Sequence, residues 1–185
     1  QRYLDLKDDG LTIVSYGDKR YPQKLTELDN PPPLLYCKGN VSLLDRAETA
    51  AVVGTRKNSK RGEVVTKRSV DFLSEAGFVT VSGLALGIDG IAHRAALASG
   101  MQTIAVLADI ERIMPPSHVS LANDILQDDG LLVSENPPGS PFFPAVFAKR
   151  DRIQAGLALA VFAIETSEDG GTMNAVKTAQ SLGRL

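Results

Sequence analysis

Two stretches of small and basic residues stand directly after apolar, β-branched runs, and their composition suits the binding of an anion. The first follows residues 50–53 and the second follows residues 78–81. A backbone that turns tightly there and enters a helix directs unpaired N–H groups and the positive end of the helix dipole at the turn. Phosphate is the anion most often held in this way. The residues concerned are Gly54, Thr55, Arg56, Lys57, Lys60 and Arg61 in the first stretch, and Ser82 and Gly83 in the second.

Arg56 can hold a phosphate through two N–H groups, and the lysines nearby add charge without selecting a base. An ordinary solvated loop rich in cations is the alternative. A second basic cluster, Lys149, Arg150 and Arg152, falls in a helical pattern in which Lys149 and Arg152 share a face. This cluster either contacts the same ligand or forms a solvated surface.

A third strand–turn–helix pattern places Gly170, Gly171 and Thr172 after an apolar strand that ends at Glu165. This turn could close over a phosphate or a sugar, although acidic residues precede it. The alternative is a plain connecting loop in which Thr172 caps the next helix.

The side chains of Asp89 and His93 could suggest acid–base chemistry, with Ser82 as a nucleophile. However, Asp89 and His93 share one helical turn, and no nucleophile elbow is present. We therefore expect both residues to support the helix start. The GxxxxGK[ST] and GxGxxG patterns are absent, which weakens nucleotide hydrolysis and dinucleotide redox chemistry as functions.

These residues must be positioned by alternating strands and helices, which predict an α/β fold with a doubly wound, mostly parallel sheet of extended Rossmann type. Residues 1–47 are rich in proline and are expected to form an arm that packs on the core and ends in a short strand, while residues 48–185 form the Rossmann-like domain. The chain stops just past a helix, so we expect it to be part of a longer protein. Strands are predicted near 50–53, 78–81, 103–107, 130–133 and 159–164, and helices near 60–76, 88–99, 117–128, 144–157 and 172–182.

The composition narrows the classes of function. A net charge of −2 argues against a generally basic nucleic-acid binder, so any such role must come from local clusters of cations. One cysteine excludes an internal disulfide, and no His/Cys cluster has zinc spacing, so neither a metal nor a cofactor is expected. No apolar run is long enough to span a membrane and no signal-peptide pattern occurs, so a cytoplasmic protein is expected.

Taken in order, the motifs resemble those of the DNA-processing protein A family, also called DprA or Smf. The resemblance extends from about Tyr21 to the end of the chain. The matching stretches are Tyr21-Pro22, residues 31–39, Val52-Val53-Gly54-Thr55-Arg56 with Gly62, Val81-Ser82-Gly83-Leu84-Ala85 with Gly87-Ile88-Asp89 and Ala92-His93, residues 103–107, Leu132-Val133-Ser134-Glu135, and residues 147–157.

The resemblance implies a non-enzymatic, dimeric protein that binds single-stranded DNA and helps to load a RecA-type recombinase during DNA uptake. Carried over by position, the DNA pocket would use Gly54, Thr55, Arg56, Lys149, Arg150 and Arg152, with Ser82 and Gly83 shaping its floor. Two departures are acidic: Asp151 stands where the family has Asn, and Glu168-Asp169 replaces a Ser/Gly-rich segment. They leave open a nucleotide-binding sensor or a phosphoribohydrolase-like enzyme of the same superfamily, with Glu165 or Asp89 as the acid or base.

Overall fold

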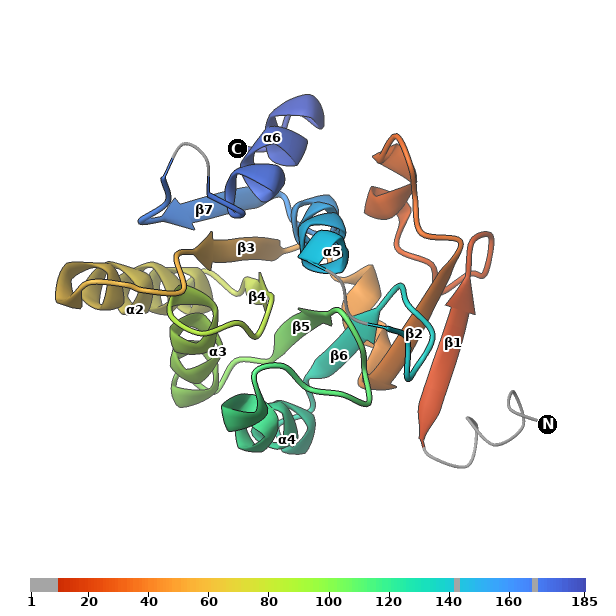
Figure 1. Ribbon diagram of the computed structural model, residues 1–185, viewed down its shortest axis with the longest axis horizontal. Coiled ribbons are helices and arrows are strands. Elements are labelled where there is room, and N and C mark those ends of the chain that lie inside the picture. The colour runs from red at the N-terminus through yellow and green to blue at the C-terminus, as the bar shows by residue number, and fades with distance from the viewer. Residues whose placement is uncertain (1–9, 142–143, 168–169) are drawn as a thin grey trace.

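The computed structural model describes residues 10–141, 144–167 and 170–185, and within them seven strands form a single sheet (Figure 1). The order of strands across the sheet is β1-β2-β6-β5-β4-β3-β7. The five strands from β6 to β7 run parallel to one another, whereas β1 and β2 are antiparallel additions at one edge. The bounds are β1 Leu11–Ser15, β2 Leu34–Gly39, β3 Thr49–Gly54, β4 Val79–Ser82, β5 Thr103–Leu107, β6 Leu131–Ser134 and β7 Ala160–Ile164.

Helices cover both faces of the sheet, which explains why its central strands are apolar at successive positions. Alternate residues of these strands point to opposite faces, so Val81 and Ile104 pack toward α5 while Val52 and Ala105 pack toward α2, α3 and α4. Helix α6 packs beside α5. The bounds are α2 Lys60–Glu75, α3 Ile88–Ala98, α4 Val119–Gln127, α5 Pro144–Leu157 and α6 Met173–Ser181.

The segment before β3 joins the same sheet. Strand β2 pairs with β6, and β1 pairs with β2. The short 3₁₀ helix η1 (Gln23–Glu27) packs on α5 through Leu25, which is fully buried. A second 3₁₀ helix, η2 (Val41–Asp45), leads into β3. The sequence analysis expected β2 but not β1, even though Leu11 and Ile13 alternate as strand residues do.

The predicted α/β class and the mostly parallel sheet are confirmed, and the five predicted strands and five predicted helices lie within about two residues of those observed. At the start of α4 the chain first forms a 3₁₀ turn, η3 (Pro116–His118). In the described part of the chain, no helix combines the length and apolarity needed to cross a membrane.

Strand order creates a crevice beside β3. The chain builds β3, β4, β5 and β6 outward in one direction and then returns to add β7 on the other side of β3. The connections after β3 and after β7 therefore leave the sheet in opposite directions, which opens a space at the carboxyl ends of these strands. In open α/β sheets, ligands bind at such a switch point.

Candidate nucleic-acid interface

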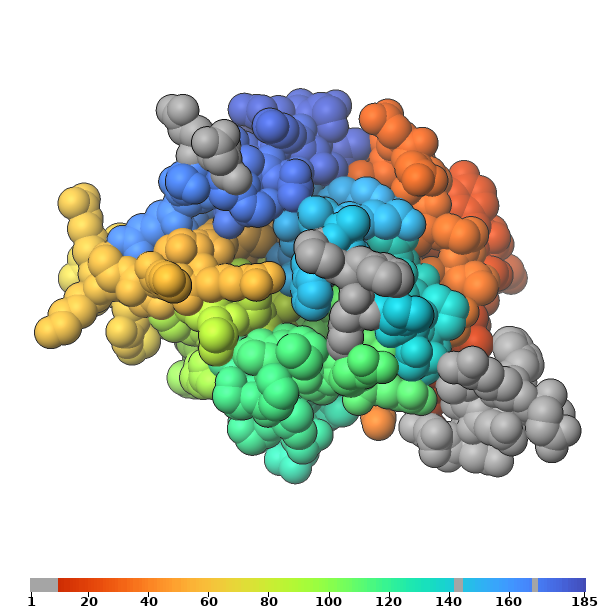
Figure 2. All heavy atoms as spheres, viewed as in Figure 1, coloured from red at the N-terminus to blue at the C-terminus, as the bar shows by residue number. Residues whose placement is uncertain are grey.

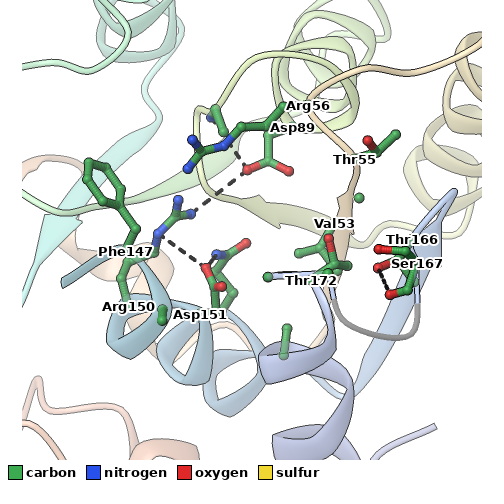
Figure 3. A pocket seen from close by; sticks show the side chains of 17 residues that line it. Val53, Thr55, Arg56, Asp89, Phe147, Arg150, Asp151, Thr166, Ser167 and Thr172 are labelled. Carbon is green, nitrogen blue, oxygen red and sulfur yellow. Dashed lines mark hydrogen bonds and ion pairs between the residues drawn. The ribbon is translucent and has the colours of Figure 1, made fainter. Parts of the chain in front are cut away.

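A cavity of about 320 Å³ lies at this switch point (Figure 3). Three connections that are distant in the sequence form its walls: the turn after β3, the turn after β4 with the first residues of α3, and the turn after β7. Helices α5 and α6 close the remaining side. Its lining residues are Val53, Gly54, Thr55, Arg56, Ala85, Asp89, Phe147, Ala148, Arg150, Asp151, Gln154, Thr166, Ser167, Gly170, Gly171, Thr172 and Ala175.

Arg56 and Phe147 stand together at the mouth of the cavity. The guanidinium carbon of Arg56 lies 5.7 Å from the centre of the Phe147 ring, a cation–π contact between the β3–α2 loop and α5 (Figure 3). Arg56 is exposed, so its charge remains available to a ligand. Figure 2 shows the residues after β3 at the molecular surface beside those of β7. The mouth thus combines a cation with a flat apolar surface.

Arg150 lies deeper and is only 4% exposed. Its Nη1 is 3.9 Å from Asp89 Oδ2 and its Nε is 3.5 Å from Asp151 Oδ1, so it sits between two carboxylates at ion-pair but not hydrogen-bond distance. Within the described residues, Arg150 Nε and Nη1 have no hydrogen-bond partner. Burial raises the pKa of Asp151 to about 6, against the opposing effect of Arg150.

Two glycines make this arrangement sterically possible. A Cβ atom at Gly83 would overlap the guanidinium of Arg150 and come within 2.6 Å of Asp89 Oδ2. Gly87 has a φ of 75° and lies against the backbone of Thr55 and Arg56. The next amide, Ile88 N–H, donates to Thr55 O at 3.1 Å. The turns after β3 and β4 are therefore joined directly, as the sequence predicted for a single site.

Carboxylates of the protein itself accept from amides at the amino end of α2 and in the turn before α3, which corrects the expectation that these amides are free for phosphate. Glu165 accepts hydrogen bonds from the Ser59 amide (2.8 Å) and the Ser59 hydroxyl, and these bonds lower its pKa. Ser59 Oγ in turn accepts from Gly62 N–H at 3.1 Å. At the start of α3, Asp89 Oδ2 accepts from Ala85 N–H at 3.4 Å. Phosphate would therefore be held by side-chain cations rather than by these amides.

His93 makes the local contacts expected of a supporting residue. Its Nδ1 lies 2.8 Å from the hydroxyl oxygen of Thr103, which donates to Thr80 O at 2.7 Å. The side chain is fully buried, and burial lowers the His93 pKa to about 3. The imidazole is therefore neutral at physiological pH, and it links α3 to two strands of the sheet.

Lys149 and Arg152 do not line this cavity, and their assignment to the ligand pocket stays a prediction. Both pair with Glu135, the residue after β6, at 3.4 Å for Lys149 Nζ and 2.7 Å for Arg152 Nη2. The Glu135 side chain is 5% exposed. The pair ties α5 to the residue that follows β6.

The remaining predicted residues divide between the rim and the interior. Lys57, Lys60 and Arg61 are exposed at the start of α2, outside the cavity. Ser82 is buried below it and donates to Val52 O at 2.6 Å. Gly171 and Thr172 line the cavity. Of the acidic departures, Asp151 also lines it, whereas residues 168–169 lie outside the described part of the chain.

The sequence analysis did not identify Phe147 and Gln154 as cavity residues. A signal was present, because Phe147, Arg150, Asp151 and Gln154 follow one another at i, i+3, i+4 and i+7, the spacing of a single helical face. Thr166 and Ser167 were also missed as lining residues, whereas Gly170 was expected in this turn. Their position depends on β7 returning beside β3, which local sequence does not specify.

Comparison with known proteins shows the family that the chain matches. Residues 12–185 match the family model described as DNA recombination-mediator protein A. The DNA processing protein DprA of Bacillus subtilis is 32% identical over 179 residues, which cover 96% of this chain and 60% of that protein. The chain thus spans about three fifths of this relative's length.

Two solved structures are similar over nearly the whole chain. DNA processing protein A from Streptococcus pneumoniae has a TM-score of 0.90 and 36% identity, covering 99% of this chain and 64% of that one. DNA processing protein A from Helicobacter pylori, whose structure is described for its single-stranded-DNA binding mode, has a TM-score of 0.84 and 28% identity, covering 94% and 78%. The chain therefore belongs to the DNA recombination-mediator protein A family, whose curated members include proteins named DprA and Smf.

Proposed function

We propose that this chain binds single-stranded DNA at the switch-point cavity, with the phosphate backbone held at its mouth. The observation that carries the proposal is Arg56, an exposed cation that stands against an aromatic ring where three turns meet. Lys57, Lys60 and Arg61 continue the positive charge from the mouth onto the start of α2. Cations that follow a strand's backbone, with an aromatic surface for a base, suit sequence-tolerant binding.

The family's description as a recombination mediator supports a further part of the proposal. The bound strand would be passed to a RecA-type recombinase, and the protein would act as a homodimer. DNA binding without catalysis suffices for this role. The carboxylates that a nucleotide-processing enzyme would need as acid or base have structural partners, because Glu165 caps α2 and Asp89 holds the start of α3.

The proposal is tested by the affinity of labelled dT oligonucleotides from one to about thirty nucleotides, measured by fluorescence anisotropy at two salt concentrations. Affinity should rise with length and fall steeply with salt. Binding that is complete with a single nucleotide would instead favour the nucleotide sensor or phosphoribohydrolase.

Arg56→Ala should weaken oligonucleotide binding about tenfold for all sequences and reduce the salt slope by about 1. The matched control is Arg46→Ala, which removes an exposed arginine before β3, at the opposite end of that strand. Equal loss of affinity in both variants would mean that total charge, rather than the cavity mouth, governs binding. Unchanged affinity for Arg56→Ala would overturn the site.

A further inference from the structure

The charged groups that line the cavity are two arginines and two aspartates from three parts of the chain. Arg150 and Asp151 come from α5, Asp89 from α3, and Arg56 from the loop after β3. Within the described residues, the turn after β7 and helix α6 line the cavity with uncharged residues only. With all four groups ionised, the lining therefore carries no net charge, although its proposed ligand is an anion.

One buried guanidinium serves both carboxylates. Asp89 and Asp151 stand on either side of Arg150 (Figure 3), at 3.9 Å and 3.5 Å, and Arg150 Nη1 and Nε form no hydrogen bond with described residues. The two pairs therefore lack the short, aligned geometry of a strong charge-assisted hydrogen bond. The charge of Asp89 also contributes to the raised pKa of Asp151, because two like charges close together disfavour ionisation.

Asp151 is the more accessible of the two carboxylates. Its side chain is 17% exposed, against 8% for Asp89. Asp89 accepts from Ala85 N–H and so supports the turn before α3. Asp151 Oδ1 accepts from Gln154 Nε2 at 3.1 Å, and the side chain of Asn174 on α6 also forms a hydrogen bond with this carboxyl. Both of these partners are neutral, so they leave the negative charge of Asp151 uncompensated.

Arg56 and Asp151 act on a phosphate in opposite directions. The charge of Arg56 tends to lower the pKa of Asp151, so the two side chains interact electrostatically. A phosphate bound to Arg56 offsets that positive charge and adds a negative charge within reach of Asp151. The ionised form of Asp151 is then less favourable, and a proton taken up by the carboxyl removes the repulsion. Burial has already raised the pKa of Asp151 to about 6, so its protonation near neutral pH costs little.

We propose that Asp151 determines how tightly the cavity mouth holds the DNA backbone, because its carboxylate weakens phosphate binding when charged and takes up a proton when a strand binds. This inference rests on the proposed binding of single-stranded DNA at the cavity. It distinguishes the cations that attract the strand from a carboxylate that limits its affinity. The affinity for DNA therefore rises as the pH falls.

The test measures the affinity of a 15-nucleotide dT strand by fluorescence anisotropy at pH 8 and pH 5, at constant ionic strength and with a rhodamine label. Thymine does not titrate between these values, and hydroxyl groups at both ends of the strand leave no terminal phosphate to titrate. The unmodified protein should bind about fivefold more tightly at pH 5. Asp151→Asn should bind at both pH values as tightly as the unmodified protein binds at pH 5.

Asp128→Asn is the matched control, because it also removes one carboxylate but lies exposed and outside the cavity. It should keep the full difference between the two pH values. Proton uptake is measured directly by isothermal titration calorimetry at pH 6.5 in two buffers of different ionisation enthalpy. The unmodified protein should take up about 0.4 proton for each strand bound, and Asp151→Asn almost none.

Three results would overturn the inference and leave the proposed function intact. The unmodified protein would bind equally at both pH values without proton uptake, or Asp128→Asn would lose the pH dependence as Asp151→Asn does, or Asp151→Asn would keep it in full. The last result would assign the titration to another group, such as His118, which is 5% exposed and does not line the cavity. Failure of the unmodified protein to bind the strand at either pH would instead overturn the proposed function.

Discussion

Arg150 illustrates how single residues determine the chemistry of the cavity. Its position requires the absence of a side chain at Gly83 and the presence of carboxylates on two different helices. An arginine stays charged when buried. Beside it, the carboxyl of Asp151 is 17% exposed, and its burial raises its pKa to about 6 even though the charge of Arg150 opposes this shift.

The raised pKa makes a prediction about stability. Because the folded-state pKa of Asp151 exceeds the ordinary value of 3.8, folding is favoured by the protonated form, and stability is lost as the pH rises from about 4 through about 6. The Asp151→Asn substitution removes this loss of stability at high pH, because the side chain can no longer ionise. We expect the free energy of unfolding at pH 8 to increase by up to about 3 kcal/mol, with little change at pH 4.

Urea denaturation at the two pH values measures this difference. Asp128→Asn, an exposed substitution at the end of α4 and outside the cavity, is the matched control. An equally steep loss of stability between pH 4 and pH 8 in the Asp151→Asn protein and the unmodified protein would contradict this expectation. In that case the Asp151 carboxyl would not be the cause of the pH-dependent loss of stability.

Helix α5 shows what the sequence could and could not predict at the level of an element. Its bounds followed from the pattern, but the pattern did not show which of its cations line the cavity. Arg150 enters the cavity, whereas Lys149 and Arg152 pair with Glu135. Polar residues of α5 line an internal cavity as well as the surface, so polarity alone does not distinguish the two faces.

The same limit applies to the start of α2. A strand followed by a basic turn was recognised, because both signals are local. The sequence did not show that Glu165 occupies the amide at the start of α2. Glu165 reaches Ser59 only because β7 pairs in parallel with β3. Contacts of this kind depend on the order of strands in the sheet, and the residues near Ser59 in the sequence do not determine that order.

Glu165 should therefore stabilise α2 from outside the helix. Glu165→Gln removes the charge that accepts from Ser59 and is expected to lower the melting temperature at pH 7. The lowered pKa of Glu165 means that this stabilisation is present above pH 4.5 and is lost as the pH falls through the folded-state value.

Circular dichroism melts at pH 7 and pH 3 test the expected difference. Glu75→Gln, at the exposed end of the same helix, gives a charge-matched comparison and should melt like the unmodified protein at both pH values. A Glu165→Gln deficit of the same size at pH 3 would show that packing, not charge, is responsible.

At the scale of the whole molecule, residues 11–47 are built into the sheet. Strand β2 continues it from β6, and Leu25 lies against Gly156 of α5, where an added Cβ would come within 2.8 Å of the leucine. Leu25, Leu35 and Leu44 are buried in the same apolar cluster as Val81 and Ile104 of the central strands. These contacts favour cooperative unfolding of residues 11–47 together with the rest of the sheet.

The tyrosines permit a direct test of this unity. All four tyrosines precede residue 48 and the chain has no tryptophan, so intrinsic fluorescence reports only on the N-terminal segment. The α-helices all follow residue 48 in the described chain, so far-UV circular dichroism at 222 nm, a wavelength typical of helices, reports mainly on the remainder. The two signals should give the same urea midpoint. Separate midpoints would show that the segment unfolds independently.

The return of β7 to the side of β3 also has a consequence for synthesis on the ribosome. Val53 and Ala175, which both line the cavity, are far apart in the sequence, and β7 is the last of the described strands to be made. A nascent chain that ends before Ala160 has neither the cavity nor a partner for the outer edge of β3. An unpaired, apolar edge is open to association with other chains. Completion of β7 therefore closes that edge, and the residues that follow β7 complete the cavity.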